Sequence, residues 1–169
     1  MSESIGQGKW ARPGVPHKGW RCFNIEDLGE VSAVCEMCES QEIRFVHHME
    51  HDEHEPLACG CICAGHMEGN IPEAQRRERY MKSIDGRRRR WLTRLWKVSR
   101  KGNPYLTVGA FMVSVFRDGD GWRGFIARRT EYAPLAGFTK RTSSLIYPTI
   151  EAAKLAVFNV LIALEKREK

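Results

Sequence analysis

Apolar residues recur at helical spacing after residue 71. Four of them lie four or seven positions apart and mark one stripe through about residue 96, which predicts a long helix. They are Tyr80, Ile84, Trp91 and Leu95. Pro72 suits the first helical position and Asn70 suits the N-cap. The Asp85-Gly86 pair is the weak point, where a bend or break is expected because glycine disfavours helix.

A second apolar face predicts a helix at the end of the chain. Thr149 is the expected N-cap, because its hydroxyl can accept a hydrogen bond from the first turn. The apolar positions that follow form one broad face at helical spacing. They are Ala152, Ala153, Ala156, Val157, Val160, Leu161 and Leu164.

Alternating patterns predict strands between these helices and before the first. Residues 42–49 alternate as one strand, residues 57–63 can return as its antiparallel partner, and residues 51–56 then form the tip of the hairpin. After the first helix, residues 105–116 fit one strand that can break at Gly109. Residues 122–129 and 143–147 fit two more strands.

The remaining segments show no regular period. Residues 1–19 are rich in Gly and Pro and are expected to form a flexible leader outside the core. Residues 20–34 have scattered apolar positions and are expected to be irregular.

The predicted class is therefore α+β. We expect a leader at 1–19, a zinc module at 20–71, a basic helical connector at 72–101, and a three-stranded antiparallel sheet with a packed C-terminal helix at 102–169.

Charge is strongly segregated along the 169-residue chain, although its net charge is only +6. Residues 22–71 carry a net charge of −10 and residues 72–101 carry +9. Clustered Lys and Arg release counterions from phosphates, so the basic half favours a polyanionic partner. The alternative is that the two halves neutralise each other within the fold.

Five of the six cysteines lie between residues 35 and 63. Cys35 and Cys38 have the C-x2-C spacing of a metal-binding knuckle, and a second cluster follows about twenty residues later. This spacing predicts one structural zinc ion, with Cys61 and Cys63 as the second pair of ligands. Cys59 and His66 are substitutes for either of these.

The order C-x2-C, hairpin, Gly-Cys-x-Cys-Ala and helix resembles the treble-clef zinc fold over residues 33–71. More closely, the chain is similar to small bacterial proteins that share a Val-His-x-Met and a Gly-Cys-x-Cys-Ala pattern. In a treble clef the knuckle and the start of a helix each supply two ligands, which would be Cys35, Cys38, Cys61 and Cys63 here. The resemblance implies a fold and a metal but no particular activity.

The string Val46-His47-His48-Met49 also looks like the start of a His-Asn-His nuclease. That resemblance would make His47 a ligand of a catalytic divalent ion and His48 a base that activates water. The further Asn and His of that family would have to be Asn70 and His66, both displaced from their usual positions.

Three strands and a packed helix resemble the small DNA-binding domains of phage integrases and plant ethylene-response factors. In those domains a sheet face lies in a DNA groove. The residues that would contribute to that face here are Trp122, Arg123, Arg128, Arg129, Lys140 and Arg141. The side chains expected to contact phosphates lie in the basic helix and on the second predicted tail strand. They are Arg76, Arg79, Lys82, Arg87, Arg88, Arg89, Arg90, Arg94, Arg123, Arg128 and Arg129.

Taken together, these patterns predict a zinc-containing, non-catalytic nucleic-acid-binding protein, with DNA as the expected partner and a regulatory or accessory role in a bacterium. A metal-dependent nuclease and a protein-interaction adaptor are the alternatives, and in the adaptor the acidic zinc module would dock on a basic partner. No stretch is apolar enough to span a membrane, and residues 1–8 lack a secretory pattern, so a cytoplasmic protein is expected.

Overall fold

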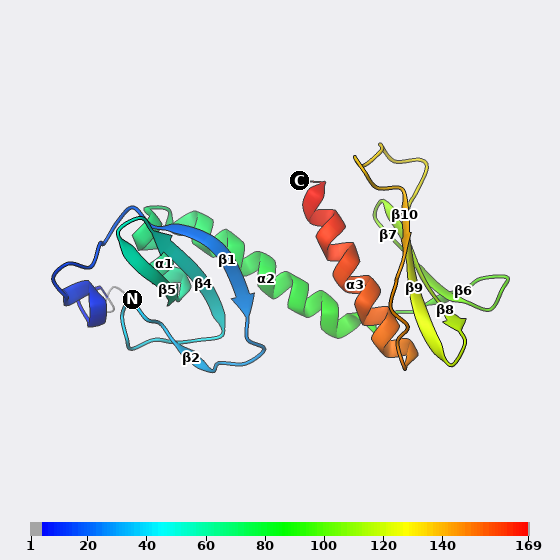
Figure 1. The fold of residues 1–169 in the computed structure, drawn as a ribbon, viewed down its shortest axis with the longest axis horizontal. Coiled ribbons are helices and arrows are strands. Elements are labelled where there is room, and N and C mark those ends of the chain that lie inside the picture. Colours follow the sequence, from blue (N-terminus) through cyan, green and yellow to red (C-terminus); the bar gives the residue numbers. More distant parts are fainter. Residues whose placement is uncertain (1–4, 169) are drawn as a thin grey trace. The chain divides into compact units, whose positions relative to one another are not determined.

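The computed structural model describes residues 5–168, an α+β fold with three α-helices and antiparallel sheets (Figure 1). The chain divides into two compact units, Met1–Ser83 and Ile84–Lys169. Helix α2 (Ile71–Trp91) begins in the first unit and ends in the second. Within the described chain, no helix is both long and apolar enough to cross a membrane.

The first unit contains a three-stranded sheet in the order β1-β4-β5. Its strands are β1 (Arg21–Asp27), β4 (Phe45–His51) and β5 (His54–Cys59), and both pairings are antiparallel. The expected hairpin is therefore present, with a tighter turn at residues 52–53. The expectation of an irregular segment at 20–34 was wrong, because residues 21–27 form an edge strand. A register shift between Cys22 and Asn24 and a largely exposed side-chain pattern hide the period of that strand.

Short elements complete the first unit. Strands β2 (Ala33–Val34) and β3 (Glu42–Ile43) pair antiparallel and enclose a tight turn. A 3-10 helix, η1 (Gly8–Ala11), lies against that turn, where the Lys9 N–H donates to the Met37 carbonyl at 2.8 Å. Trp10 of η1 is buried in the core. This part of the expected leader therefore belongs to the folded unit.

Two helices follow β5 almost without a break. Helix α1 (Cys61–Glu68) ends at Gly69, whose φ of 75° is the left-handed conformation that glycine adopts most easily. The Asn70 side chain then accepts a hydrogen bond from the Glu73 N–H at 3.1 Å, which confirms the predicted cap of α2. Helix α2 runs through Asp85-Gly86 without the expected break.

The second unit is built on a five-stranded antiparallel sheet in the order β10-β9-β8-β7-β6. The strands are β6 (Lys97–Val98), β7 (Pro104–Val108), β8 (Phe111–Asp118), β9 (Gly121–Arg128) and β10 (Lys140–Thr142). The expected strand at 105–116 does break at Gly109, which has a φ of 54°. The strand expected at 143–147 was misplaced. The strand that pairs with β9 lies at 140–142. After it, the Ser143 N–H donates to the Gly124 carbonyl at 2.8 Å, and Tyr147 forms an isolated bridge to Trp122.

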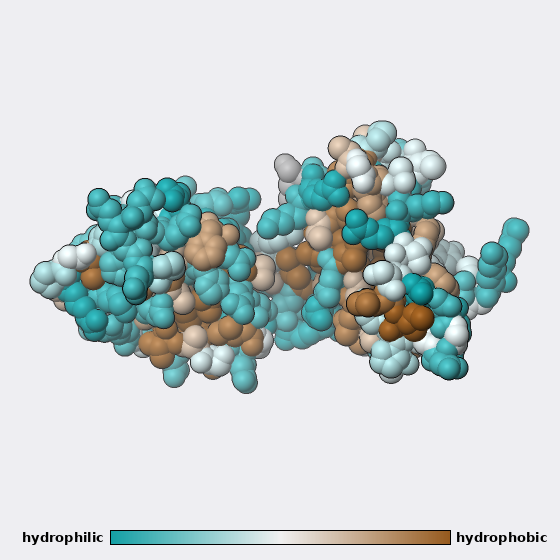
Figure 2. All heavy atoms as spheres, viewed as in Figure 1, coloured by the Kyte–Doolittle hydropathy of each residue, from teal (hydrophilic) through white to brown (hydrophobic). Residues whose placement is uncertain are grey.

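Helix α3 (Ile150–Arg167) covers one face of this sheet, with the predicted Thr149 cap accepting from the Ala152 N–H at 3.1 Å. Its buried side chains Phe158 and Leu161 pack with Phe111 and Trp91 in the core of the unit. Elsewhere the surface is mixed. Figure 2 shows hydrophilic side chains interrupted by hydrophobic patches on each unit.

Candidate metal centre and nucleic-acid surface

Three buried cysteines of the first unit meet at one point. Cys35 and Cys38 lie in the turn between β2 and β3, and Cys63 lies in the first turn of α1. Their sulfur atoms are all within 4.8 Å of one another, and none of the three is more than 1% exposed. This group could hold a metal ion.

The turn is shaped so that its backbone supports the sulfur atoms. The Cys35 N–H donates to the Gln41 carbonyl and the Glu39 N–H donates to the Cys35 carbonyl, both at 2.8 Å. Glu39 adopts a φ of 55° to close the turn. The N–H groups of Cys38 and Gly60 donate to the Cys35 sulfur. Such donors stabilise a thiolate, which is the form that ligates metals.

Cys59, at the end of β5, is a further buried thiol that contacts Cys35, although it lies outside the group of three sulfurs that are all within 4.8 Å of one another. Hydrogen bonds from the Cys59 and Cys63 thiols hold the pKa of Cys35 far below its ordinary value. The same contacts with Cys35, followed by burial, raise the pKa of both Cys59 and Cys63. The Cys35 thiolate therefore accepts hydrogen bonds from two neighbouring thiols. A metal cation could replace the protons of those thiols.

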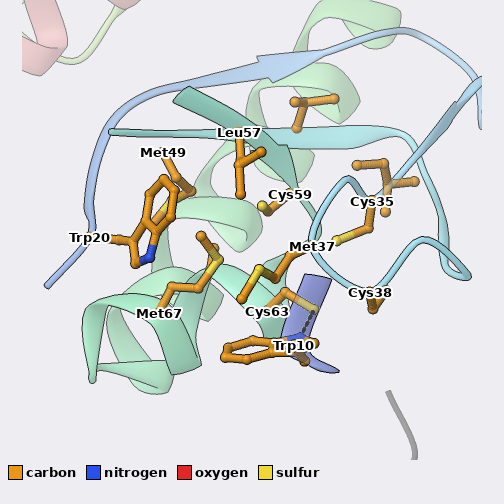
Figure 3. Close-up of a cluster of buried hydrophobic side chains, with 13 residues drawn as sticks. Trp10, Trp20, Cys35, Met37, Cys38, Met49, Leu57, Cys59, Cys63 and Met67 are labelled. Atoms are coloured by element: carbon orange, nitrogen blue, oxygen red, sulfur yellow. Dashed lines mark hydrogen bonds between the residues drawn. The ribbon is translucent and has the colours of Figure 1, made fainter. Parts of the chain in front are cut away.

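Apolar side chains enclose the cysteines (Figure 3). Met37, between Cys35 and Cys38, is completely buried. The Trp10 indole N–H donates to the Cys63 sulfur at 3.5 Å, shown as a dashed line in Figure 3. The three sulfur atoms are therefore closed off from the surface, as the ligands of structural metal sites are.

Cys61, the fourth ligand predicted from the sequence, lies elsewhere. Its sulfur is within 4.8 Å of ligand atoms of His47 and Glu78. Burial and the neighbouring Glu78 carboxylate raise the pKa of Cys61 to about 11. The substitute His66 is on α1 with its ring 6.5 Å from the Trp10 ring, outside the group of three cysteines.

The two histidines of the nuclease alternative point to opposite sides of β4. His47 is completely buried, its Nε2 lies 3.3 Å from the Ala74 carbonyl, and burial lowers its pKa. His48 instead pairs with Glu26 on β1 at 2.9 Å. A ligand and a base on opposite faces of one strand cannot act on the same water, so this arrangement gives the nuclease alternative no support.

Most of the basic side chains predicted to contact phosphates on α2 are engaged within the fold. Arg87 makes two hydrogen bonds to Glu165 at 2.7 and 2.9 Å, and Arg88 donates to the Asn159 side chain at 2.7 Å. Ion pairs also join Arg76 to Glu73, Lys82 to Glu78 and Arg89 to Asp85. Arg79, Arg90 and Arg94 form no ion pair with any residue from 5 to 168.

The arginines predicted on the second tail strand are paired as well. Arg123 contacts Asp118, Arg128 contacts Glu168, and Arg129 contacts Glu131. Trp122 packs partly against the core, and Arg128 lies over the ring of Phe111. These side chains therefore make contacts within the second unit.

The sheet face opposite α3 has a different character. The register places Tyr105, Ser114, Phe125 and Thr142 in one row across four strands. The row lines a groove of about 760 Å³, and no acidic side chain contributes to it. The lining residues are Ser99, Arg100, Lys101, Asn103, Tyr105, Met112, Ser114, Phe116, Phe125 and Thr142. We call this surface the open sheet face.

Cationic side chains at this face differ from those on α2. Arg100 and Lys101, in the turn between β6 and β7, line the groove and make no ion pair within the described chain. Lys140 pairs in register with Ala127 and so shares the face of Phe125. Sequence reasoning missed Tyr105, Phe116 and Phe125, although their alternation with buried Leu106, Val113 and Val115 could have identified them.

Comparison with known proteins adds no assignment. No protein-family model, curated protein or solved structure matches this chain.

Proposed function

We propose that this protein is a zinc-containing, DNA-binding protein. In this proposal a zinc ion ligated by Cys35, Cys38, Cys59 and Cys63 stabilises the first unit, and the open sheet face of the second unit binds the nucleic acid. The two parts rest on separate observations and can be tested separately.

The zinc assignment rests on the donor set and its spacing. Four sulfur ligands around zinc at about 2.3 Å would lie about 3.8 Å apart in a tetrahedron. The group of Cys35, Cys38 and Cys63, whose sulfurs lie within 4.8 Å of one another, needs only a small contraction to reach this geometry. Cys59 replaces Cys61 as the fourth ligand because its thiol contacts Cys35. The order of knuckle, hairpin and helix is that of a treble clef, but in this ligand set the start of α1 supplies one ligand and the end of β5 supplies the other.

The DNA-binding assignment rests on one observation, the pairing of half-exposed aromatic rings with unpaired cations on the open sheet face. A phosphate contact needs a protein cation that is free to displace the counterions condensed on the nucleic acid. Arg100 and Lys101 meet that condition, whereas Arg87 and Arg123 are held by carboxylates. Aromatic rings such as Phe125 can stack on bases or contact the apolar edges of bases in a groove.

The role of Phe125 can be tested by fluorescence anisotropy. Labelled duplex DNA, single-stranded DNA and RNA would be titrated with the zinc-loaded full chain. Phe125→Ala should weaken binding to the single-stranded probes by about 5- to 150-fold, because stacking of an unpaired base on an aromatic ring contributes about 1–3 kcal/mol. The matched control is Phe23→Ala, since Phe23 is 57% exposed in the first unit.

The cations are tested by the dependence of affinity on salt. The double variant Arg100→Gln, Lys101→Gln should reduce the salt slope by about 2 on duplex DNA. Tighter binding to single-stranded DNA or RNA would redirect the proposal toward that partner. Equal affinities for the wild type and both open-face variants would contradict it.

A further inference from the structure

A second group of ligating side chains lies in the first unit, outside the cysteine cluster. His47 of β4, Cys61 at the start of α1 and Glu78 of α2 each place one ligand atom within 4.8 Å of the others. The three residues come from three elements and are separated by 14 and 17 positions. Only the tertiary fold brings them together.

His47 is the side chain that most needs an explanation. It is completely buried, and its Nδ1 has no hydrogen-bond partner within residues 5–168. Its Nε2–H can donate to the Ala74 carbonyl at 3.3 Å, which leaves a lone pair on Nδ1. Buried polar atoms almost always have a partner, and a carbonyl that orients a histidine from behind is typical of metal ligands.

The group borders a pocket of about 440 Å³ within the same unit. Cys61 and Glu78 line this pocket, and His47 does not. An ion held by the three side chains would therefore be reached from the pocket side, where a fourth position faces solvent.

We propose that His47, Cys61 and Glu78 bind a second divalent ion of the zinc class, with one coordination position open to the pocket. One nitrogen, one sulfur and one carboxylate oxygen form a borderline-soft donor set that suits zinc better than magnesium or calcium. Three protein ligands with an open fourth position are the arrangement of reactive zinc sites, in contrast to the closed cysteine cluster.

The ion pair of Glu78 is compatible with this role. Lys82 contacts one Glu78 oxygen at 2.6 Å, and the second oxygen remains for the metal. The site uses no residue of the open sheet face, so the test of this metal site is independent of DNA binding.

Metal stoichiometry of the full chain tests the proposal. The protein would be loaded with zinc, separated from free metal by gel filtration and measured by elemental analysis. Wild type should hold two zinc ions per chain, and Cys61→Ser and Glu78→Gln should each hold one. Cys22→Ser is the matched control and should keep two, because Cys22 belongs to neither group.

Each other outcome overturns the proposal. One zinc in wild type that Glu78→Gln retains means that His47, Cys61 and Glu78 hold no ion. One zinc that Cys61→Ser loses means that Cys61 belongs to the cysteine cluster. Circular dichroism verifies the fold of each variant. If Cys61→Ser does not fold, Glu78→Gln decides alone, because its amide keeps the side-chain shape and removes the ligating charge.

Discussion

Substitution of Arg87 distinguishes two roles for the four consecutive arginines at 87–90, a structural role and a DNA-binding role. Its guanidinium forms two hydrogen bonds to Glu165 of α3 and lies 5.9 Å from the centre of the Phe158 ring. The side chains of Arg87 and Glu165 are 32% and 23% exposed. Arg87→Gln should therefore destabilise the second unit and leave the salt slope of DNA binding unchanged.

The size of the loss follows from this partial burial. A fully exposed ion pair contributes about 0.2–1 kcal/mol, and breaking a fully buried pair costs about 3–5 kcal/mol. A bidentate pair at intermediate exposure should lie between these limits, at about 1–2 kcal/mol. For a unit of this size, each kcal/mol lowers the melting temperature by about 4–8 °C.

Thermal unfolding followed by tryptophan fluorescence measures the effect, since the Trp91 ring packs 5.1 Å from Phe158. Arg90→Gln is the matched control, because Arg90 has no ion pair in the described chain and should change stability little. Glu165→Gln should destabilise as Arg87→Gln does, and the double variant should cost less than the sum. An unchanged melting temperature combined with a shallower salt slope in Arg87→Gln would refute the reasoning.

Three further predictions concern the cores of the two units. Cys59→Ser should release zinc from the cysteine cluster and unfold the first unit, as measured by elemental analysis and circular dichroism; retained zinc would exclude Cys59 as a ligand. Gly124→Ala should cost about 1–3 kcal/mol in urea unfolding, because the new methyl would lie 2.2 Å from Val157 Cγ2, and Val157→Ala should restore part of the loss. Trp10→Phe removes the hydrogen bond to the Cys63 sulfur and should speed zinc transfer to a chelator about fivefold, because such a hydrogen bond contributes about 1 kcal/mol. An unchanged transfer rate would mean that the hydrogen bond does not stabilise the thiolate.

Helices α2 and α3 were predictable because their signals are local, although α2 ends at Trp91 and not near residue 96, and α1 begins at Cys61 inside the strand expected at 57–63. Asn70 and Thr149 cap α2 and α3 as their side-chain chemistry predicts, and each is followed by an apolar stripe. The expected break at Asp85-Gly86 did not occur. Asp85 pairs with Arg89 one turn later, and Arg87 and Arg88 are bonded to α3, so contacts within and beyond the helix offset the low propensity of glycine.

The edge strand β1 was not predictable from its own residues. Phe23 is 57% exposed, and the register shift after Cys22 interrupts the alternation. What specifies the strand is its partner β4, together with a bidentate pair in which Arg44 donates to Asp27 at 2.6 and 2.8 Å. Tertiary pairing of this kind leaves no periodic signal in the sequence.

The ligand set shows the limit of spacing rules most clearly. Cys61 and Cys63 are two residues apart, which suggests a pair, but α1 begins at Cys61 and successive helical residues rotate by about 100°. The two side chains therefore diverge by about 200°, one toward Cys35 and the other toward His47 and Glu78. Cys59 precedes the helix on a strand whose register places it opposite His47, and its thiol reaches Cys35. A strand end followed at once by a helix start thus directs neighbouring cysteines to different sites, so Cys61→Ser and Cys63→Ser should not be equivalent variants.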